Sequence, residues 1–227
     1  TLFCIAALYS TWGVVYLSIK FALVSFPPVL LSSIRYMSAG YIFLLWPFFI
    51  KKDRALPAKT QFITIFFASC MMIVIGGAFL NISGLYINSG TIALLMGSTP
   101  LWMVVVSWFL GYDKKPSASV FAGLIGGFIG VGVLAVSTGI LGGSNAVLGI
   151  ITIFISMAGW VAGSIFLKHR HSDMDMIESL GFQMVTGGLI MFGISFLTGE
   201  LAGFDISEIT LKAFLSTLHL IFFGSII

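Results

Sequence analysis

Two cations inside otherwise apolar stretches are the residues best placed to do chemistry in this chain. Lys20 and Arg35 flank the short segment 24–28, and Arg35 lies about six residues into the apolar run 29–50. At 1.5 Å of helical rise per residue, that position is roughly 9 Å deep. Such a cation can attract a ligand carboxylate in a cavity, extend to lipid headgroups, or pair with backbone carbonyls. All three roles remain open at this point.

The acidic residues are distributed differently from these cations. All eight Asp and Glu residues lie between the apolar runs or at their ends, and none lies deep within one. Carriers that exchange protons for cationic compounds often keep a carboxylate within the membrane. The pattern therefore favours a neutral, zwitterionic or anionic ligand.

Aromatic and polar side chains within the runs are further candidates for lining a central cavity. Pro100 lies inside the run 91–111, where it removes a backbone hydrogen bond and should kink a helix. His219 is a lone ionisable group in mid-run, which makes it a functional candidate, although a hydrogen bond to a neighbouring helix would also explain it. Gln183 could equally be an interhelical hydrogen-bonding residue. The full candidate set, with ordinary helix packing as the alternative reading, is Trp12, Tyr16, Lys20, Arg35, Ser98, Thr99, Pro100, Trp102, Trp160, Gln183 and His219.

Catalytic and metal-binding patterns are missing from the sequence. It contains no HExxH motif, no phosphate-binding Walker loop and no credible catalytic triad. Cys4 and Cys70 lie in apolar runs without a metal-ligand spacing. We therefore expect no enzymatic activity, no cofactor and no bound metal.

The composition identifies the environment of these side chains. Of 227 residues, 59% are hydrophobic and only 8% are charged, whereas a soluble domain carries roughly 25% charged residues. This excludes a soluble globular enzyme and a disordered chain, and a net charge of +3 excludes a nucleic-acid binder. The chain is predicted to be an all-α, multi-pass protein of the lipid bilayer. The predicted spans are 2–23, 29–50, 61–80, 91–111, 119–138, 147–167, 176–198 and 211 to the end.

The basic residues predict the orientation of these spans. The loops 51–60, 112–118 and 168–175 contain eight of the eleven Lys and Arg residues, and the loops on the opposite side contain almost none. By the positive-inside rule, these three loops and the N-terminus face the cytoplasm.

An internal repeat relates the two parts of the chain. Trp12 and Lys20 have counterparts 148 residues later in Trp160 and Lys168, and Arg35 then aligns with Gln183. The offset contains five predicted spans, so the second copy would be inverted in the membrane, with the ligand site near the midplane between the copies. We expect a first five-helix repeat over 1–138 and a second over 147–227 that stops within its third helix. Ten helices would complete the pattern, of which about seven and a half are present.

Several short motifs give the chain a family resemblance. They are Trp12-Gly13 with Lys20, Phe26-Pro27-Pro28, Arg35 with Ala39-Gly40, Gly90-Thr91-Ile92-Ala93, Ser98-Thr99-Pro100-Leu101, the glycines of 123–132 and Phe223-Gly224-Ser225. Together they resemble the ten-helix EamA type of the drug/metabolite transporter superfamily. One departure is Gly111-Tyr112-Asp113, where that family usually has Gly-Glu.

The resemblance implies a secondary transporter of the bacterial inner membrane. Its expected activity is the export of small metabolites, such as amino acids or related compounds, by alternating access, as a monomer or a homodimer. The small-molecule substrate and the bilayer would be its partners, with no nucleic acid. The alternatives are a carrier for metabolite uptake or exchange, and a non-transporting membrane sensor or assembly protein.

Overall fold

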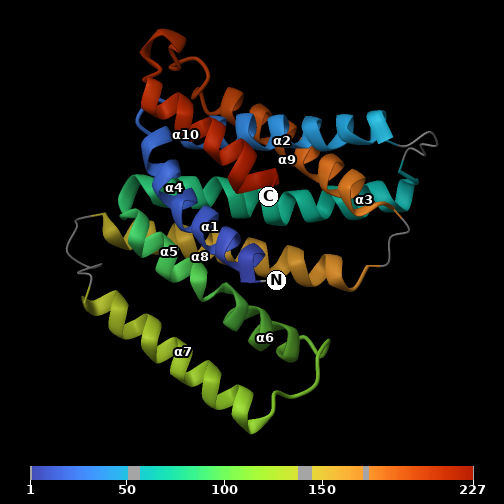
Figure 1. Cartoon of the computed structure of the whole chain (residues 1–227), viewed down its shortest axis with the longest axis vertical. Helices are drawn as coiled ribbons and strands as arrows, with labels where there is room; N and C mark the ends of the chain where they lie inside the picture. Colours follow the sequence, from blue (N-terminus) through green and yellow to red (C-terminus); the bar gives the residue numbers. More distant parts are fainter. Residues whose placement is uncertain (1, 51–56, 138–144, 171–173, 227) are drawn as a thin grey trace.

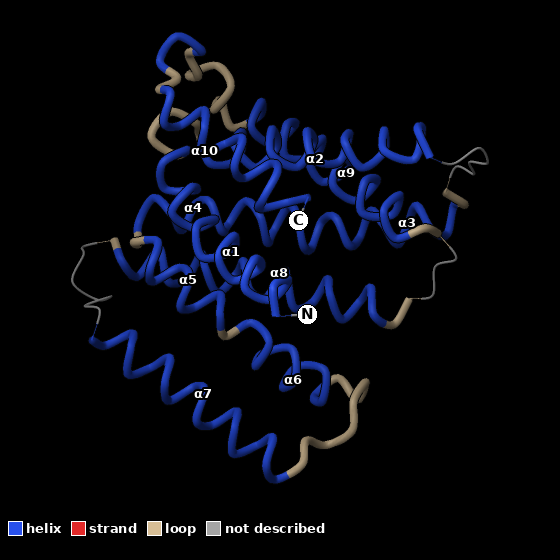
Figure 2. The backbone as a smooth tube through the Cα atoms, in the orientation of Figure 1, coloured by secondary structure: helices blue, strands red, loops and turns tan. Residues whose placement is uncertain are grey.

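The fold was examined in a computed structural model that describes residues 2–50, 57–137, 145–170 and 174–226. Throughout these ranges the regular secondary structure is helical, and short loops connect the helices (Figures 1 and 2). The predicted all-α fold class is confirmed.

Eight helical segments occupy the positions of the eight predicted spans in the described part of the chain. The third and fourth spans are composite, and the third continues to Tyr86, beyond its predicted end at 80. Five segments are long and apolar enough to cross a membrane, whereas α7 and α10 contribute shorter apolar helices. The segments are α1 (Leu2–Ala22), α2 (Pro28–Ile50), α3 (Lys59–Ala68) with the π-helix η1 (Ser69–Gly77) and α4 (Ala78–Tyr86), α5 (Ser89–Gly97) with α6 (Thr99–Phe109), α7 (Ala118–Ser137), α8 (Ala146–Lys168), α9 (Met176–Leu197), and α10 (Leu211–Ile221) with the π-helix η4 (Phe222–Ile226).

The break between α5 and α6 lies where Pro100 predicts a kink. Proline has no backbone N–H, so the carbonyl of Met96 loses the partner that a residue at position 100 would normally supply. The Thr99 hydroxyl donates to that carbonyl over 2.6 Å, and the Ser98 hydroxyl donates to the carbonyl of Leu95. Pro100 therefore starts a new helix at a position where its missing donor is tolerated.

Helices α2 and α9 make the most extensive contact in the bundle and run side by side in opposite directions (Figure 1). Gly40 of α2 faces Val185, and Gly188 of α9 faces Met37, each so closely that a Cβ atom would overlap its neighbour. An offset of 148 residues relates the two glycines and also their two partners. The contact is therefore approximately two-fold symmetric about an axis between α2 and α9.

The remaining contacts follow the same offset. Helix α1 packs on α10, and its counterpart α8 packs on η1 and α4. Helices α2 and α9 start at Pro28 and Met176, which are 148 residues apart, and each third span contains a π-helical segment. The correspondence detected in the sequence is thus also a correspondence of helix boundaries and of packing.

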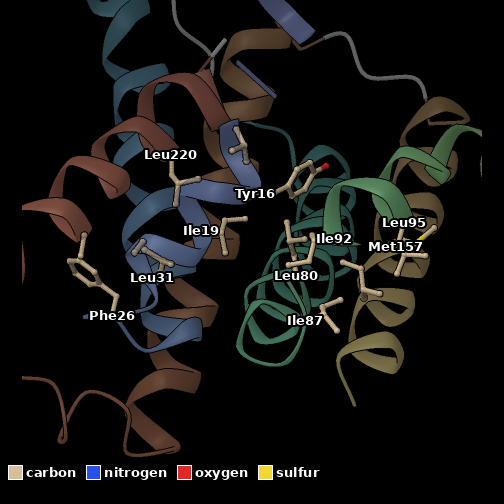
Figure 3. Close-up of a cluster of buried hydrophobic side chains, with 14 residues drawn as sticks. Tyr16, Ile19, Phe26, Leu31, Leu80, Ile87, Ile92, Leu95, Met157 and Leu220 are labelled. Carbon is tan, nitrogen blue, oxygen red and sulfur yellow. The ribbon is translucent and has the colours of Figure 1, made fainter. Parts of the chain in front are cut away.

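The buried core lies where α1, α4, α5, α8 and α10 meet (Figure 3). Ile19, Ile92, Ile153 and Leu220 are fully buried there. Helices α2, α5, α8 and α10 begin on one side of this bundle, and α3, α7 and α9 begin on the other (Figure 1).

Candidate functional site

The candidate residues from the sequence fall into separate groups in the structure. Tyr16, Arg35 and His219 gather around the end of α10 and η4; Trp160 and Gln183 contact η1; and Ser98, Thr99, Pro100 and Trp102 surround the α5–α6 break. Trp12 and Lys20 lie on α1, where Trp12 is exposed and Lys20 is partly exposed.

Arg35 is a buried cation, only 6% exposed. Its Nε donates to the Ser225 hydroxyl over 2.8 Å, and its Nη2 donates to the carbonyl of Gly224 over 2.5 Å. The guanidinium carbon lies 5.0 Å from the centroid of the Tyr36 ring. Pairing with a backbone carbonyl, one of the three roles left open above, is present, and no acidic side chain among the described residues forms an ion pair with Arg35.

Two further polar side chains lie near the Arg35 guanidinium. Tyr16 is 8% exposed, and both its hydroxyl and the His219 ring interact electrostatically with Arg35. His219 Nδ1 lies 3.0 Å from the Ser18 hydroxyl, which gives this histidine a hydrogen bond to a neighbouring helix. Its ring also stacks on Phe223 at a centroid distance of 5.2 Å. Helices α1, α2 and α10 thus bring Tyr16, Arg35 and His219 together.

A second polar cluster surrounds η1. Gln183 is buried, and its Nε2 donates to the Met72 sulfur over 3.4 Å. The Ser156 hydroxyl of α8 donates to the carbonyl of Gly76 over 2.6 Å. The Trp160 indole lies directly against Gly76, and its buried Nε1 has no hydrogen-bond partner.

The two clusters correspond under the offset of 148 residues. Arg35 of α2 contacts η4, and its counterpart Gln183 of α9 contacts η1. π-Helical turns are rare and occur frequently at functional sites. The structure therefore places the strongest polar candidates beside the two irregular segments of the bundle, one in each third span.

The third group has a different surrounding, formed by α7 and α8. The Trp102 ring packs edge-on against Phe128 at 5.2 Å and Phe154 at 6.3 Å. Ser98 is buried, whereas Pro100 is exposed. The hydroxyls of Ser98 and Thr99 are occupied by carbonyls of their own helical segment.

Sequence reasoning missed the role of Glu200, whose carboxylate lies at the N-terminus of α2. It accepts hydrogen bonds from the backbone N–H groups of Val29, at 3.4 Å, and Leu30, at 2.9 Å, and from the Ser195 hydroxyl. An anion is favourable at a helix N-terminus, where backbone donors are unpaired. An acidic residue in one loop and a helix start 170 residues away carry no signal of this contact.

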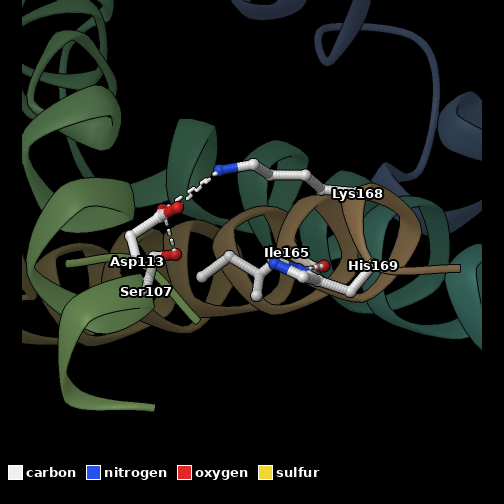
Figure 4. A network of polar contacts seen from close by, with 5 residues as sticks. All are labelled: Ser107, Asp113, Ile165, Lys168 and His169. Carbon is white, nitrogen blue, oxygen red and sulfur yellow. Dashed lines mark hydrogen bonds and ion pairs between the residues drawn. The ribbon is translucent and has the colours of Figure 1, made fainter. Parts of the chain in front are cut away.

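A second connection joins the α6–α7 turn to the end of α8 on the opposite side of the bundle (Figure 4). Asp113 accepts from the Ser107 hydroxyl and forms an ion pair with Lys168 at 3.0 Å. The Ser107 hydrogen bond, and then Lys168, hold the pKa of Asp113 below its usual value. The Tyr112 ring stacks on His169 at 4.1 Å. Asp113 thus has a partner on α8 at the point where the resembled family usually has Glu.

The described residues contain no cluster of three or more His, Cys, Asp or Glu side chains arranged to bind a metal ion. A shallow pocket of about 280 Å³ lies between the α1–α2 and α9–α10 loops and is lined by residues such as Phe26, Phe204 and Asp205.

Eight apolar helical segments with this symmetric packing define the chain as a multi-pass helical membrane protein. The sequence profile of the EamA-like transporter family matches residues 1–136, which is more than half of the chain. The chain belongs to the EamA-like transporter family, and it is therefore a membrane transporter rather than an enzyme. The predicted family is confirmed.

Relatives in other bacteria match most of the chain. The uncharacterized inner membrane transporter YedA of Escherichia coli is 25% identical over 223 residues, which cover 97% of this chain and 69% of YedA. The uncharacterized transporter YvbV of Bacillus subtilis is 25% identical over 198 residues, covering 87% of this chain and 63% of YvbV. YoaV of Bacillus subtilis, also an uncharacterized transporter, is 21% identical over 187 residues. No solved structure matches the chain significantly.

Proposed function

We propose that the protein exports small metabolites, such as amino acids or related compounds, by alternating access. The observation that carries this proposal is the symmetric contact between α2 and α9, in which Gly40 and Gly188 occupy equivalent positions. Two inverted repeats that meet about such an axis can rock against each other around a central ligand site. The repeats would span residues 1–138 and 147–227.

The location and orientation follow from the relatives and the charges. YedA carries the description of an inner membrane transporter, and we extend that location to this chain. The loops 51–60, 112–118 and 168–175 would face the cytoplasm together with the N-terminus, because they contain most of the basic residues.

Both ends of the bundle contain a connection between the two repeats. On the proposed cytoplasmic side, Asp113 of the first repeat pairs with Lys168 of the second. On the opposite side, Glu200 of the second repeat binds the start of α2 in the first. Alternating access requires that the connection at one end opens while the other holds.

The test combines export with a reversible restraint on this motion. Cells that express the complete gene are compared with cells that carry an empty vector, and extracellular amino acids and related acids are measured by mass spectrometry. A second arm treats the Asp113→Cys, Lys168→Cys double variant with a short bismaleimide, and the two single-cysteine variants serve as controls.

We expect at least one compound to accumulate outside the expressing cells, and cross-linking to stop export in the double variant alone. Accumulation inside the cells instead would overturn export in favour of uptake. No change in either direction would overturn transport of this compound class. Unchanged export after complete cross-linking would refute opening at this end of the bundle.

A further inference from the structure

We infer that Arg35 binds the carboxylate group of the transported compound, in a subsite completed by Tyr16 and His219, so that the substrates are carboxylates. This inference rests on the proposed transport function and specifies which chemical group the carrier recognises. The argument proceeds from the charge of Arg35, through the geometry of its hydrogen bonds, to its neighbours.

The first observation is a buried positive charge with neutral partners. Arg35 is 6% exposed, and its contacts are the Ser225 hydroxyl, the Gly224 carbonyl and the Tyr36 ring. A charge taken out of water is costly unless an opposite charge compensates it, and ionisable groups within a membrane usually mark a ligand pathway. No described acidic side chain supplies that compensation, so a carboxylate of the ligand is the matching group.

The second observation is that the guanidinium is held in place with one edge free. Its Nε and Nη2 atoms already donate to Ser225 and Gly224, and no described residue accepts from Nη1. Gly224 permits this approach, because a Cβ atom at that position would lie 3.1 Å from Nη2. Arginine binds carboxylates through two parallel N–H donors, and the Nη1 edge offers such a pair in a fixed orientation.

The third observation concerns the groups beside that edge. The Tyr16 hydroxyl forms no hydrogen bond to the described residues, and it interacts electrostatically with Arg35. His219 uses Nδ1 for Ser18, which leaves Nε2 available. The side chains around them, such as Val15, Ile19 and Leu220, are apolar and buried. A few convergent polar groups in apolar surroundings are typical of a small-molecule site.

The test measures binding rather than export, so that the two proposals can fail independently. The probes are the twenty proteinogenic amino acids and their carboxamides, which keep the side chain and the ammonium group but lose the carboxylate. Binding to the full-length protein purified in detergent is measured as thermal stabilisation over a range of probe concentrations. The variants are Arg35→Gln and Arg35→Lys, and Lys59→Gln is the control because Lys59 is an exposed cation at the start of α3.

We expect at least one amino acid to bind the unmodified protein and the Lys59→Gln variant about 10- to 100-fold more tightly than its carboxamide, which matches the strength of charge-assisted hydrogen bonds. In Arg35→Gln this preference should disappear, and in Arg35→Lys it should be reduced. A residue that only holds η4 in place would weaken both probes equally and leave their ratio unchanged.

Three results would overturn the inference: an unchanged ratio in Arg35→Gln, equal binding of an amino acid and its carboxamide by the unmodified protein, or no binding of any amino acid. Carboxylate preference without export in cells would instead overturn the proposed function and leave the subsite in place. Export in cells combined with an unchanged ratio in Arg35→Gln would do the reverse.

Discussion

The contact between α2 and α9 predicts that Gly188→Ala destabilises the protein. The new methyl group would lie 2.9 Å from the backbone nitrogen of Met37 and 2.5 Å from its Cγ. Rotation of the Met37 side chain relieves the second contact but not the first, because the backbone atom belongs to α2. The two helices would therefore have to move apart along their whole contact.

Two opposing effects determine the magnitude. Replacing glycine by alanine within a helix stabilises it by about 0.5–1 kcal/mol. Forcing an extra methyl group into a well-packed contact costs about 1–3 kcal/mol. Because the overlap involves the backbone, we expect the packing cost to dominate, with a net loss of roughly 1–2 kcal/mol in the free energy of unfolding. Gly40→Ala should behave similarly, because its methyl group would lie 2.8 Å from the Val185 backbone nitrogen.

The assay is SDS-induced unfolding of the purified protein in mixed micelles. Gly193→Ala is the matched control, because it lies on the same helix and a Cβ atom there meets no atom within 4 Å. The control should be unchanged or stabilised by up to about 1 kcal/mol. If Gly188→Ala is as stable as Gly193→Ala, the close α2–α9 contact and the symmetry axis inferred from it are refuted.

Three further predictions concern polar contacts. Glu200→Gln should lower the free energy of unfolding by about 1 kcal/mol, because it removes the charged acceptor at the start of α2; the same SDS titration measures this. Ser156→Ala should cost about 1–3 kcal/mol, because it leaves the buried Gly76 carbonyl without this donor; this loss is also read by SDS unfolding. Because the pKa of Asp113 is lowered in the folded protein, its carboxylate contributes stability above its ordinary pKa of about 4 and loses it as the pH falls through the lowered value. The stability difference between the protein and Asp113→Asn should therefore be constant from about pH 8 to pH 5 and vanish at lower pH.

Each of these predictions has a control or a contrary outcome. Glu208→Gln removes an exposed carboxylate near the same loop, and equal losses in the two Glu variants would exclude a specific contact at α2. A Ser156→Ala variant of unchanged stability would show that the Gly76 carbonyl has another partner. A stability difference for Asp113→Asn that changes between pH 6 and pH 8 would contradict a lowered pKa for Asp113.

Much of the architecture was predictable because it depends on local composition. Long apolar runs form membrane helices, since every backbone polar group must be paired within the segment. The break near Pro100 was also predictable, because a missing N–H is a property of a single residue. The offset of 148 residues predicted which helices correspond, although it did not predict which of them touch.

The end of the third span illustrates where composition fails. Its apolar run was predicted to stop at 80, before the polar residues Asn81 and Ser83. In the structure, Asn81 donates to the Ser32 hydroxyl of α2 over 2.7 Å, and Ser83 donates to the carbonyl of Leu80. These partners make both polar side chains tolerable within a buried helix, so α4 continues to Tyr86.

The sequence by itself determined the membrane environment, the spans, the repeat and the family, because each is written in local hydropathy, charge or motif spacing. Only the tertiary structure decided which candidates share a site. Arg35 meets Ser225 across 190 residues of sequence, and Glu200 meets the start of α2 across 170. The π-helical form of η1 and η4 also came from the structure, since an apolar run reads alike in an α-helix and a π-helix. Such contacts depend on how helices pack against one another, which residue order alone does not record.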